Sequence, residues 1–122
     1  QQVPSVVVNS FKAKFPQVTD VDLERSRTHY EVEFEIGRLD HEIWLNQEGE
    51  VIRHQQELKI RSLPEQARSQ VRQQFPGYRV IEADQLQTEK MTVYKLELIT
   101  WTNKTEITVD EQGQVLEGFI WD

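Results

Sequence analysis

The feature of this 122-residue chain that most constrains its fold is an internal repeat. Two pairs, each an apolar residue followed by proline, return 60 positions later in the same order. The pairs are Val3-Pro4 with Leu63-Pro64, and Phe15-Pro16 with Phe75-Pro76. Because proline fixes its own backbone angle and removes a hydrogen-bond donor, two prolines in register are unusual in unrelated segments. The pattern indicates that one unit was duplicated.

The match continues beyond these pairs at a spacing of 64, as a four-residue insertion in the second copy would produce. Residues 30–34 (Tyr-Glu-Val-Glu-Phe) fall on residues 94–98 (Tyr-Lys-Leu-Glu-Leu). Apolar and turn positions further on also match, namely Ile43, Leu45, Gly49, Val51 and Ile52 with Ile107, Val109, Gly113, Val115 and Leu116. Both copies are therefore expected to have the same elements.

Each copy is predicted to begin with a helix, because apolar residues recur at every fourth position and so share one helical stripe. The two stripes are Val3, Val7, Phe11 and Phe15, and Leu63, Ala67, Val71 and Phe75. The prolines at 16 and 76 end the helices. Both stripes are expected to pack on the core.

After each helix the period changes to two, which predicts half-buried strands. The predicted strands are 18–24, 30–36, 43–45 and a closing strand from Val51 in the first copy, and 78–83, 94–98, 107–109 and 115–120 in the second. The chain is therefore predicted to have an α+β fold with the order αββββ twice. The helices are expected on one face of an antiparallel sheet, and the other face is expected to be open.

We interpret residues 1–122 as a single domain of two repeats, 2–60 and 62–120. A unit of about 60 residues buries only about 60% of the surface that its unfolded chain exposes. The repeats are therefore expected to share a sheet or to dock on each other.

Composition excludes several classes of function. The formal charge of −7 repels phosphate backbones and anionic lipids, so nucleic acid is not an expected partner. The absence of cysteine excludes disulfides and zinc-thiolate sites. The longest apolar run falls far short of the roughly 20 residues of a membrane helix, so no membrane insertion is expected. The start at Gln1 rather than Met is interpreted as a mature exported form or a trimmed segment.

The combination of motifs resembles the PepSY-like family over nearly the whole chain. These motifs are a helix ending in Phe-Pro, a Tyr-x-Val/Leu-x-Phe/Leu strand, and a strand running into Asn/Asp-x-x-Gly-x-Val-Ile/Leu. The chain resembles the small two-repeat proteins of that group, which are similar in architecture to the secreted beta-lactamase-inhibitor protein. The resemblance implies an exported protein of the bacterial periplasm or cell surface, after signal-peptide removal, with a binding or inhibitory role. That inhibitor carries disulfides and this chain has no cysteine, so no target and no binding residue is carried over.

A search for catalytic and metal-binding motifs finds none. His29, His41 and His54 do not belong to an HExxH or His-x-His cluster, and the serines lack a nucleophile elbow. The glutamates of 31–35 could crowd together or hold calcium, but such a row is more typical of the solvated face of a strand. We therefore predict no enzyme activity, no metal and no cofactor.

The alternation leaves mostly charged side chains facing away from the helices, with Trp44 among them. An outward tryptophan among carboxylates is typical of an interface hot spot, although it also packs well on cross-strand neighbours. Trp101, near a predicted turn, has the same ambiguity. The open sheet edges also allow a partner strand to pair. The residues predicted to bind a protein are Trp44, Glu31, Glu33, Glu35, Glu42, Glu97 and Trp101.

The leading hypothesis is a non-catalytic exported binding module that inhibits or regulates an envelope protease or another enzyme by protein–protein contact. The alternative is a small-ligand carrier or sensor that binds in a cleft between the repeats. A third hypothesis, an enzyme built from Glu and His on the sheet, requires a perturbed carboxylate beside a histidine in a cleft.

Overall fold

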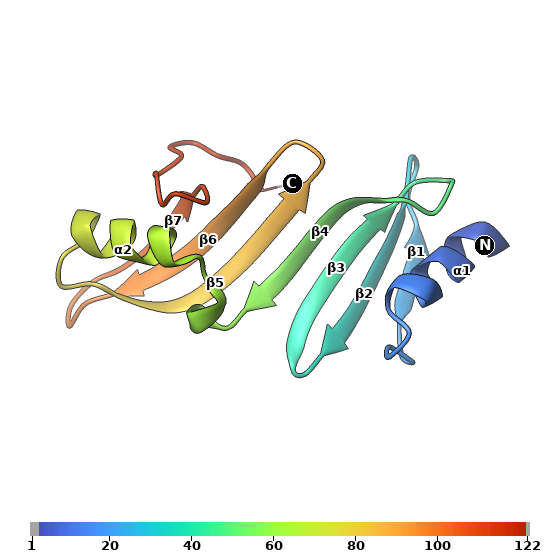
Figure 1. Ribbon diagram of the computed structural model, residues 1–122, viewed down its shortest axis with the longest axis horizontal. Helices are drawn as coiled ribbons and strands as arrows, with labels where there is room; N and C mark the ends of the chain where they lie inside the picture. The colour runs from blue at the N-terminus through green and yellow to red at the C-terminus, as the bar shows by residue number, and fades with distance from the viewer. Residues whose placement is uncertain (1–2, 122) are drawn as a thin grey trace. The chain divides into compact units, whose positions relative to one another are not determined.

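The structure is a computed structural model that describes residues 3–121. Contacts divide the chain into two compact units. Of the described residues, 3–56 and 87–90 form the first unit, and 57–86 and 91–121 form the second. Both units are of the α+β class, with one α-helix and antiparallel strands in each (Figure 1).

The first unit follows the predicted order of a helix and four strands. Its elements are α1 (Ser5–Lys14), β1 (Asp22–Arg25), β2 (Tyr30–Ile36), β3 (Leu39–Leu45) and β4 (Val51–Leu58), the last two residues of β4 being counted with the second unit. The strands lie side by side in chain order. Val32 of β2 lies opposite Ile43 of β3, and Ile43 lies opposite His54 of β4.

The second unit has one helix and three strands after a short 3-10 turn at Ile60–Ser62. Its elements are α2 (Glu65–Gln74), β5 (Arg79–Thr88), β6 (Thr92–Ile99) and β7 (Lys104–Val109), the last two residues of β5 being counted with the first unit. These strands also follow one another in chain order, and Tyr94 of β6 lies opposite Val109 of β7. None of the helices in the described part of the chain is long and apolar enough to span a membrane.

Each unit has its own core between the helix and one face of its strands. In the first unit the buried cluster is Val7, Phe11, Tyr30, Val32, Phe34, Ile43 and Leu45. In the second it is Leu63, Val71, Ala83, Tyr94, Leu96, Leu98 and Val109. The middle of each predicted helical stripe is buried, and the residues at its end, Phe15 and Phe75, are half-buried against the same clusters.

The same tight turn follows β3 and β7, and in each unit the helix packs closely against it. Asn46 and Asp110 each accept two backbone N–H groups on a side-chain oxygen, a geometry that Asn and Asp favour. The turn ends at Gly49 (φ 84°) or Gly113 (φ 87°). A Cβ there would lie 2.7 or 2.6 Å from a side-chain atom of α1 or α2. Both the backbone angle and the close helix therefore require glycine.

The closing strand predicted over 115–120 is wrong. After β7 the chain makes one isolated antiparallel bridge at Val115 and then turns away. The Phe119 N–H donates back to the Leu116 carbonyl at 3.4 Å, around Gly118 with a φ of 73°. A turn with glycine in the left-handed region ends the strand before it can pair further.

The first strand of each copy differs in length from its prediction. β1 begins at Asp22 rather than at 18, because Val18 belongs to a turn in which its N–H donates to the Phe15 carbonyl at 3.1 Å. β5 continues to Thr88, five residues beyond the predicted end at 83.

Candidate protein-binding face

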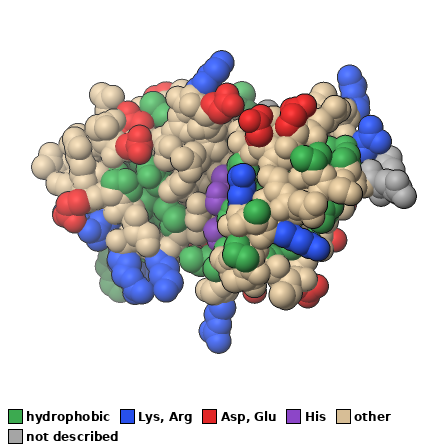
Figure 2. All heavy atoms as spheres, turned by 45° about the vertical axis from the view of Figure 1, so that its right-hand side comes forward, with side chains coloured by type: hydrophobic (Ala, Val, Ile, Leu, Met, Phe, Trp, Pro, Cys, Tyr) green, Lys and Arg blue, Asp and Glu red, His purple; other side chains and the backbone are tan. Residues whose placement is uncertain are grey.

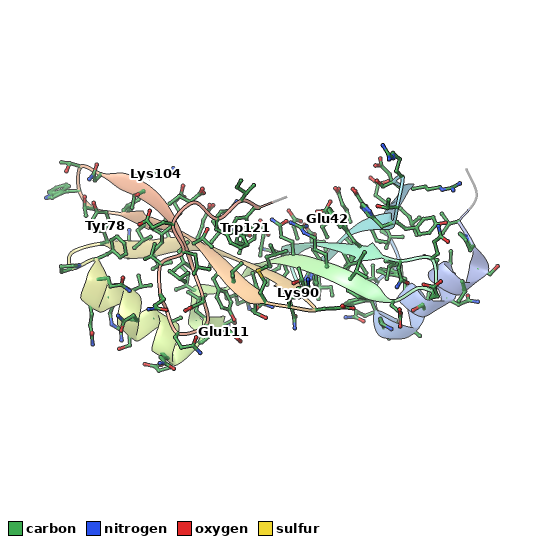
Figure 3. All side chains as sticks on the ribbon, turned by 90° about the horizontal axis from the view of Figure 1, so that it is seen from above. Glu42, Tyr78, Lys90, Lys104, Glu111 and Trp121 are labelled. Carbon is green, nitrogen blue, oxygen red and sulfur yellow. The ribbon has the colours of Figure 1, made fainter. Side chains whose placement is uncertain are left out.

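The open face of the first unit, on the side away from α1, carries closely opposed carboxylates; Glu42 is labelled there in Figure 3. Antiparallel pairing places acidic residues directly opposite one another on β1, β2 and β3. The opposed pairs are Asp22 with Glu33, Glu33 with Glu42, Glu24 with Glu31, and Glu35 with Asp40. Like charges in such positions destabilise a sheet, by an amount comparable to the roughly 0.2–1 kcal/mol that favourable pairs contribute. A cation near this face would relieve the repulsion.

Trp44 lies among these carboxylates, flanked by a histidine from the β2 side and an arginine from β4. The His29 ring stacks on the indole with a centroid distance of 4.1 Å and an interplanar angle of 20°. The guanidinium carbon of Arg53 lies 4.6 Å from the indole centroid, which is a cation–π distance. The ring is half-buried, and its Nε1 has no hydrogen-bond partner among the described residues. The indole is thus held in one orientation.

Both neighbours of Trp44 also contact carboxylates. His29 Nε2 lies 2.9 Å from Glu31 Oε2, and an Arg53 guanidinium nitrogen lies 3.7 Å from Glu42 Oε1. Arg53 is only 6% exposed, and a buried charge is costly unless such partners surround it. These contacts connect the aromatic centre of the face to two of its acidic residues.

The carboxylates of this face change the pKa of Glu42. Burial raises the pKa of the Glu42 carboxyl above its ordinary value, and the charges of Glu31 and Glu33 raise it further. Arg53 and His29 oppose the change without reversing it. Desolvation and repulsion both disfavour the charged form of Glu42, so keeping this carboxyl group ionised costs free energy.

Five of the seven predicted site residues come together on this face, namely Trp44, Glu31, Glu33, Glu35 and Glu42. The other two belong to the second unit. Glu97 lies opposite Glu106 on β7, and its carboxylate is 3.2 Å from Lys104 Nζ. Trp101, in the turn between β6 and β7, is 98% exposed, so its ring has almost no contact with the protein.

Two members of this face, His29 and Arg53, were not predicted from the sequence. His29 precedes β2, so the alternation of that strand does not orient it. Arg53 should share the helix side with Val51 by simple alternation. A register shift between Trp44 and Leu45 instead places Arg53 opposite Trp44, because a β-bulge inserts one extra residue and reverses the alternation.

Trp121 was also missed, and it covers the corresponding face of the second unit. Its indole N–H donates to Thr108 Oγ1 at 3.0 Å. Lys95 Nζ lies 5.0 Å from the indole centroid. Trp121 and α2 lie on opposite sides of the strands (Figure 3). The apolar residues 119–121 indicate in the sequence that the tail packs on the protein. The face that the tail reaches depends on the turn at Gly118, which the sequence pattern does not reveal.

Two histidines lie close together on the helix side of the first unit. His41 Nδ1 and His54 Nε2 are 2.9 Å apart, beside the rings of Phe34 and Phe15. Burial lowers the pKa of His54 to about 4, with a further contribution from His41. Histidine side chains reach the surface next to hydrophobic ones in Figure 2. Within residues 3–121, no group of three or more potential metal ligands converges.

A family model described as "putative beta-lactamase-inhibitor-like, PepSY-like" matches residues 1–53 and 38–117. The chain belongs to this family. Two overlapping matches of one family model to the PepSY-like chain are consistent with its internal repeat. No curated protein matches it in sequence.

Solved structures of Bacteroides proteins share the fold of this PepSY-like chain. One, described as a putative periplasmic protein of Bacteroides eggerthii, has a TM-score of 0.73 at 16% identity, over 96% of this chain and 88% of that one. A DUF2874 family protein of Bacteroides uniformis has a TM-score of 0.72 at 16% identity, over 95% and 88%. A protein of Bacteroides fragilis described as BLIP-like has a TM-score of 0.72 at 16% identity, over 96% and 85%. At this identity the likeness concerns the fold.

Proposed function

We propose that this PepSY-like protein is a non-catalytic binding module whose acidic open face in the first unit engages a basic surface of another protein. The proposed partner is an enzyme of the bacterial envelope, such as a protease, which the module restrains by contact. The observation that carries the proposal is the row of directly opposed carboxylates around Trp44 on β1, β2 and β3.

Opposed carboxylates weaken the sheet that holds them, so they are unfavourable for folding alone. A partner that brings lysine or arginine side chains to the face replaces repulsion with attraction, and it also associates faster because opposite potentials steer the encounter. The net charge of −7 acts in the same direction.

Trp44 supplies the apolar part of the proposed interface. Interface hot spots are enriched in tryptophan and arginine, and both occur together here in the stacked group of His29, Trp44 and Arg53. Because these rings are already held in place, binding would cost little side-chain entropy. Glu97 and the exposed Trp101 of the second unit are proposed as additional contacts.

The proposed location is the periplasm or cell surface of a bacterium. Support comes from the family resemblance and from the description of the Bacteroides eggerthii structure as periplasmic. The organisation as one domain of two repeats, 2–60 and 62–120, is part of the same proposal. The alternative of a small-ligand carrier stays a prediction.

A matched pair of charge-reversal variants tests this function. Glu33→Lys with Glu35→Lys reverses two exposed carboxylates of the face, and Glu48→Lys with Glu111→Lys makes the same change of charge at two exposed turn positions. Each is used to capture proteins from an envelope extract at low and high salt. We expect a partner that the wild type and the turn variant retain, that the face variant loses, and that salt weakens.

The captured enzyme is then assayed with purified protein. Its activity is expected to fall on addition of the wild type and of the turn variant, and to stay unchanged with the face variant. Equal capture by both variants would show that the acidic face is not the binding surface.

A further inference from the structure

The outer edge of β7 lacks the strand that covers the corresponding edge in the first unit. There, β3 pairs with β4 through five registered positions, from His41 with Gln56 to Leu45 with Val51. In the second unit, β7 is the last strand of its sheet, and within residues 3–121 it meets the following segment at the single bridge to Val115. The rest of the β7 edge therefore presents a backbone surface like the one that β4 occupies on β3.

The direction of the free backbone groups follows from one hydrogen bond. The Leu116 N–H donates to the Thr108 carbonyl at 2.8 Å, so Thr108 points its backbone groups away from β6. In an antiparallel strand these groups alternate, so Glu106, two residues earlier, also points its N–H and C=O outward. Neither group of Glu106 has a backbone hydrogen-bond partner across that edge among residues 3–121, and a new strand would pair with both.

A groove runs along this edge, with room for another segment. It has a volume of about 690 Å³ and lies between the end of α2, the edge of β7 and the tail after Val115. On the helix side its lining includes Phe75 and Ile107, and on the other side Glu106. The groove is thus apolar toward α2 and acidic toward the open face.

The first unit shows which side chains suit this position. There, β4 places Arg53 3.7 Å from Glu42 on the open face, and His54 with its ring centroid 6.1 Å from that of Phe15 on the helix side. By the repeat spacing, the counterparts of Glu42 and Phe15 are Glu106 and Phe75.

The tail of the second unit does not supply the matching groups. The counterparts of Arg53 and His54 at the same spacing are Glu117 and Gly118, an acidic residue and a residue without a side chain. Within residues 3–121, Glu106 is therefore left without the cation that Glu42 has. Phe75 lacks a counterpart of the His54 imidazole, and its ring contact is with Tyr78 at a centroid distance of 6.0 Å.

We propose that the β7 edge binds an extended peptide segment of a partner protein, which adds a strand with a basic side chain over Glu106 and an aromatic or imidazole ring over Phe75. This recognition is β-strand addition, in which backbone hydrogen bonds supply affinity and alternate side chains supply specificity. The site does not depend on the acidic face of the first unit.

The edge strand of the first unit, β1, is a poorer candidate. β1 has four residues, three of them charged, and three of its four positions are exposed. Short and charged edge strands resist pairing. β7 is longer, with six residues, and has the groove beside it.

The probe is a synthetic peptide with the sequence of β4, residues 51–58 (Val-Ile-Arg-His-Gln-Gln-Glu-Leu), acetylated and amidated. It is titrated into the ¹⁵N-labelled chain of residues 1–122 and followed by NMR. We expect saturable shifts at the amides of residues 104–108 and of Phe75. A peptide with Arg53→Gln is expected to bind roughly fivefold more weakly, since an exposed ion pair is worth up to about 1 kcal/mol.

Backbone methylation of the peptide provides a matched control without changing the protein. In the β4 register the Gln55 amide faces the neighbouring strand and the His54 amide faces away. N-methylation at Gln55 is expected to weaken binding at least tenfold, and N-methylation at His54 to leave it unchanged. Equal affinity of the two methylated peptides would overturn strand addition.

A protein variant tests the same edge from the other side. Glu106→Pro removes an outward N–H, which an edge strand tolerates, and is expected to abolish the shifts. Glu106→Gln keeps the N–H and is expected to weaken binding to about the extent of the peptide Arg53→Gln change.

Other occupants of the groove would give different results. Shifts confined to residues 22–25 would place the peptide on β1 and overturn the proposal. A concentration-dependent dimer that Glu106→Pro dissociates would assign the edge to a second copy of the chain. Slow hydrogen exchange at Glu106 without added peptide, in a monomer, would show that the chain covers the edge itself.

Discussion

The two units cover the middle of their open faces with an indole, but by different routes. In the first, the indole is Trp44 of β3 itself, with Arg53 at 4.6 Å. In the second, the position 64 residues later is Thr108, and Trp121 returns from the tail to donate to its hydroxyl at 3.0 Å, with Lys95 at 5.0 Å. A tail that turns to place Trp121 there does not also continue as a strand along β7. Both open faces therefore carry an indole, but their strand edges differ. The edge of β3 is paired with β4, whereas within residues 3–121 the edge of β7 has the single bridge to Val115.

The charges of the two faces differ as well. On β1, β2 and β3, acidic residues oppose acidic residues, and Arg53 is buried beside Trp44. On β6 and β7, Lys104 lies 3.2 Å from Glu97, and Lys95 lies opposite Thr108. The second face has an opposed acidic pair, Glu97 with Glu106, with a lysine beside it, whereas the first has four such pairs. We therefore assign the electrostatic recognition of a basic partner to the first face.

The largest expected difference between the units lies in their cores. Phe11 is 3% exposed and contacts the rings of Phe15 and Phe34, whereas its counterpart 60 residues later is Val71, 2% exposed. Phe11→Ala is expected to lower the free energy of unfolding by about 3–5 kcal/mol, and Val71→Ala by about 2 kcal/mol, because the removed volume is smaller. Urea denaturation measures both. Equal losses would mean that the aromatic cluster of the first unit relaxes around the cavity.

The two indoles are expected to contribute differently to the free energy of unfolding. Trp44→Ala is expected to cost about 2 kcal/mol of stability, less than a fully buried ring because the side chain is half-buried. Trp121→Ala is expected to cost about 1 kcal/mol, close to one hydrogen bond and its cation–π contact. Thermal or urea unfolding of both variants checks this order. A larger loss for Trp121→Ala would show that the tail, rather than the β3 indole, is the more important cover.

The periodic parts of the structure could be predicted from the sequence, and the parts decided by a single residue could not. Helix stripes, the strands around Val32 and Leu96 and the glycine turns follow from local patterns that occur twice. The segment 115–120 is apolar enough to be a strand, but Gly118 at a φ of 73° turns it away.

The candidate site also combines periodic features with features that one residue decides. Alternation places the glutamates of β2 on the open face, because every second residue points the same way. The position of Arg53 depends on a bulge next to Trp44, and the sequence carries no periodic signal for it. The boundaries of the repeats within one domain stay a prediction.

A pH-dependent loss of stability is expected from the first unit, because its His41 and His54 correspond to Thr105 and Gly118 in the second. Burial lowers the pKa of His54 from 6.5 to about 4. The unfolded chain therefore binds a proton at higher pH than the folded chain does. The stability that neutral His54 contributes is complete above pH 6.5 and is lost as the pH falls toward 4.

The loss is expected to be about 1–2 kcal/mol, since water near a partly exposed ring screens the effect. Urea denaturation at pH 7.5 and pH 4.5 measures it. In His54→Gln the part of the pH dependence that this ring contributes should disappear, while acidic groups keep theirs. An unchanged pH profile in this variant would assign the effect to other groups.

The smallest expected effect is a gain in stability. Glu42 has a raised pKa because of burial and the charges of Glu31 and Glu33, so its carboxylate favours folding less as the pH rises through that pKa. Glu42→Gln removes the repulsion and keeps an oxygen that can accept from Arg53. We expect the free energy of unfolding at pH 7 to rise by roughly 0.2–1 kcal/mol, and the gain to shrink at acidic pH. The counterpart Glu106→Gln should gain less, because Glu97, which lies opposite, is already 3.2 Å from Lys104. If Glu42→Gln is instead destabilising, attraction to Arg53 outweighs the repulsion, and this face gains no stability from the cations of a basic partner.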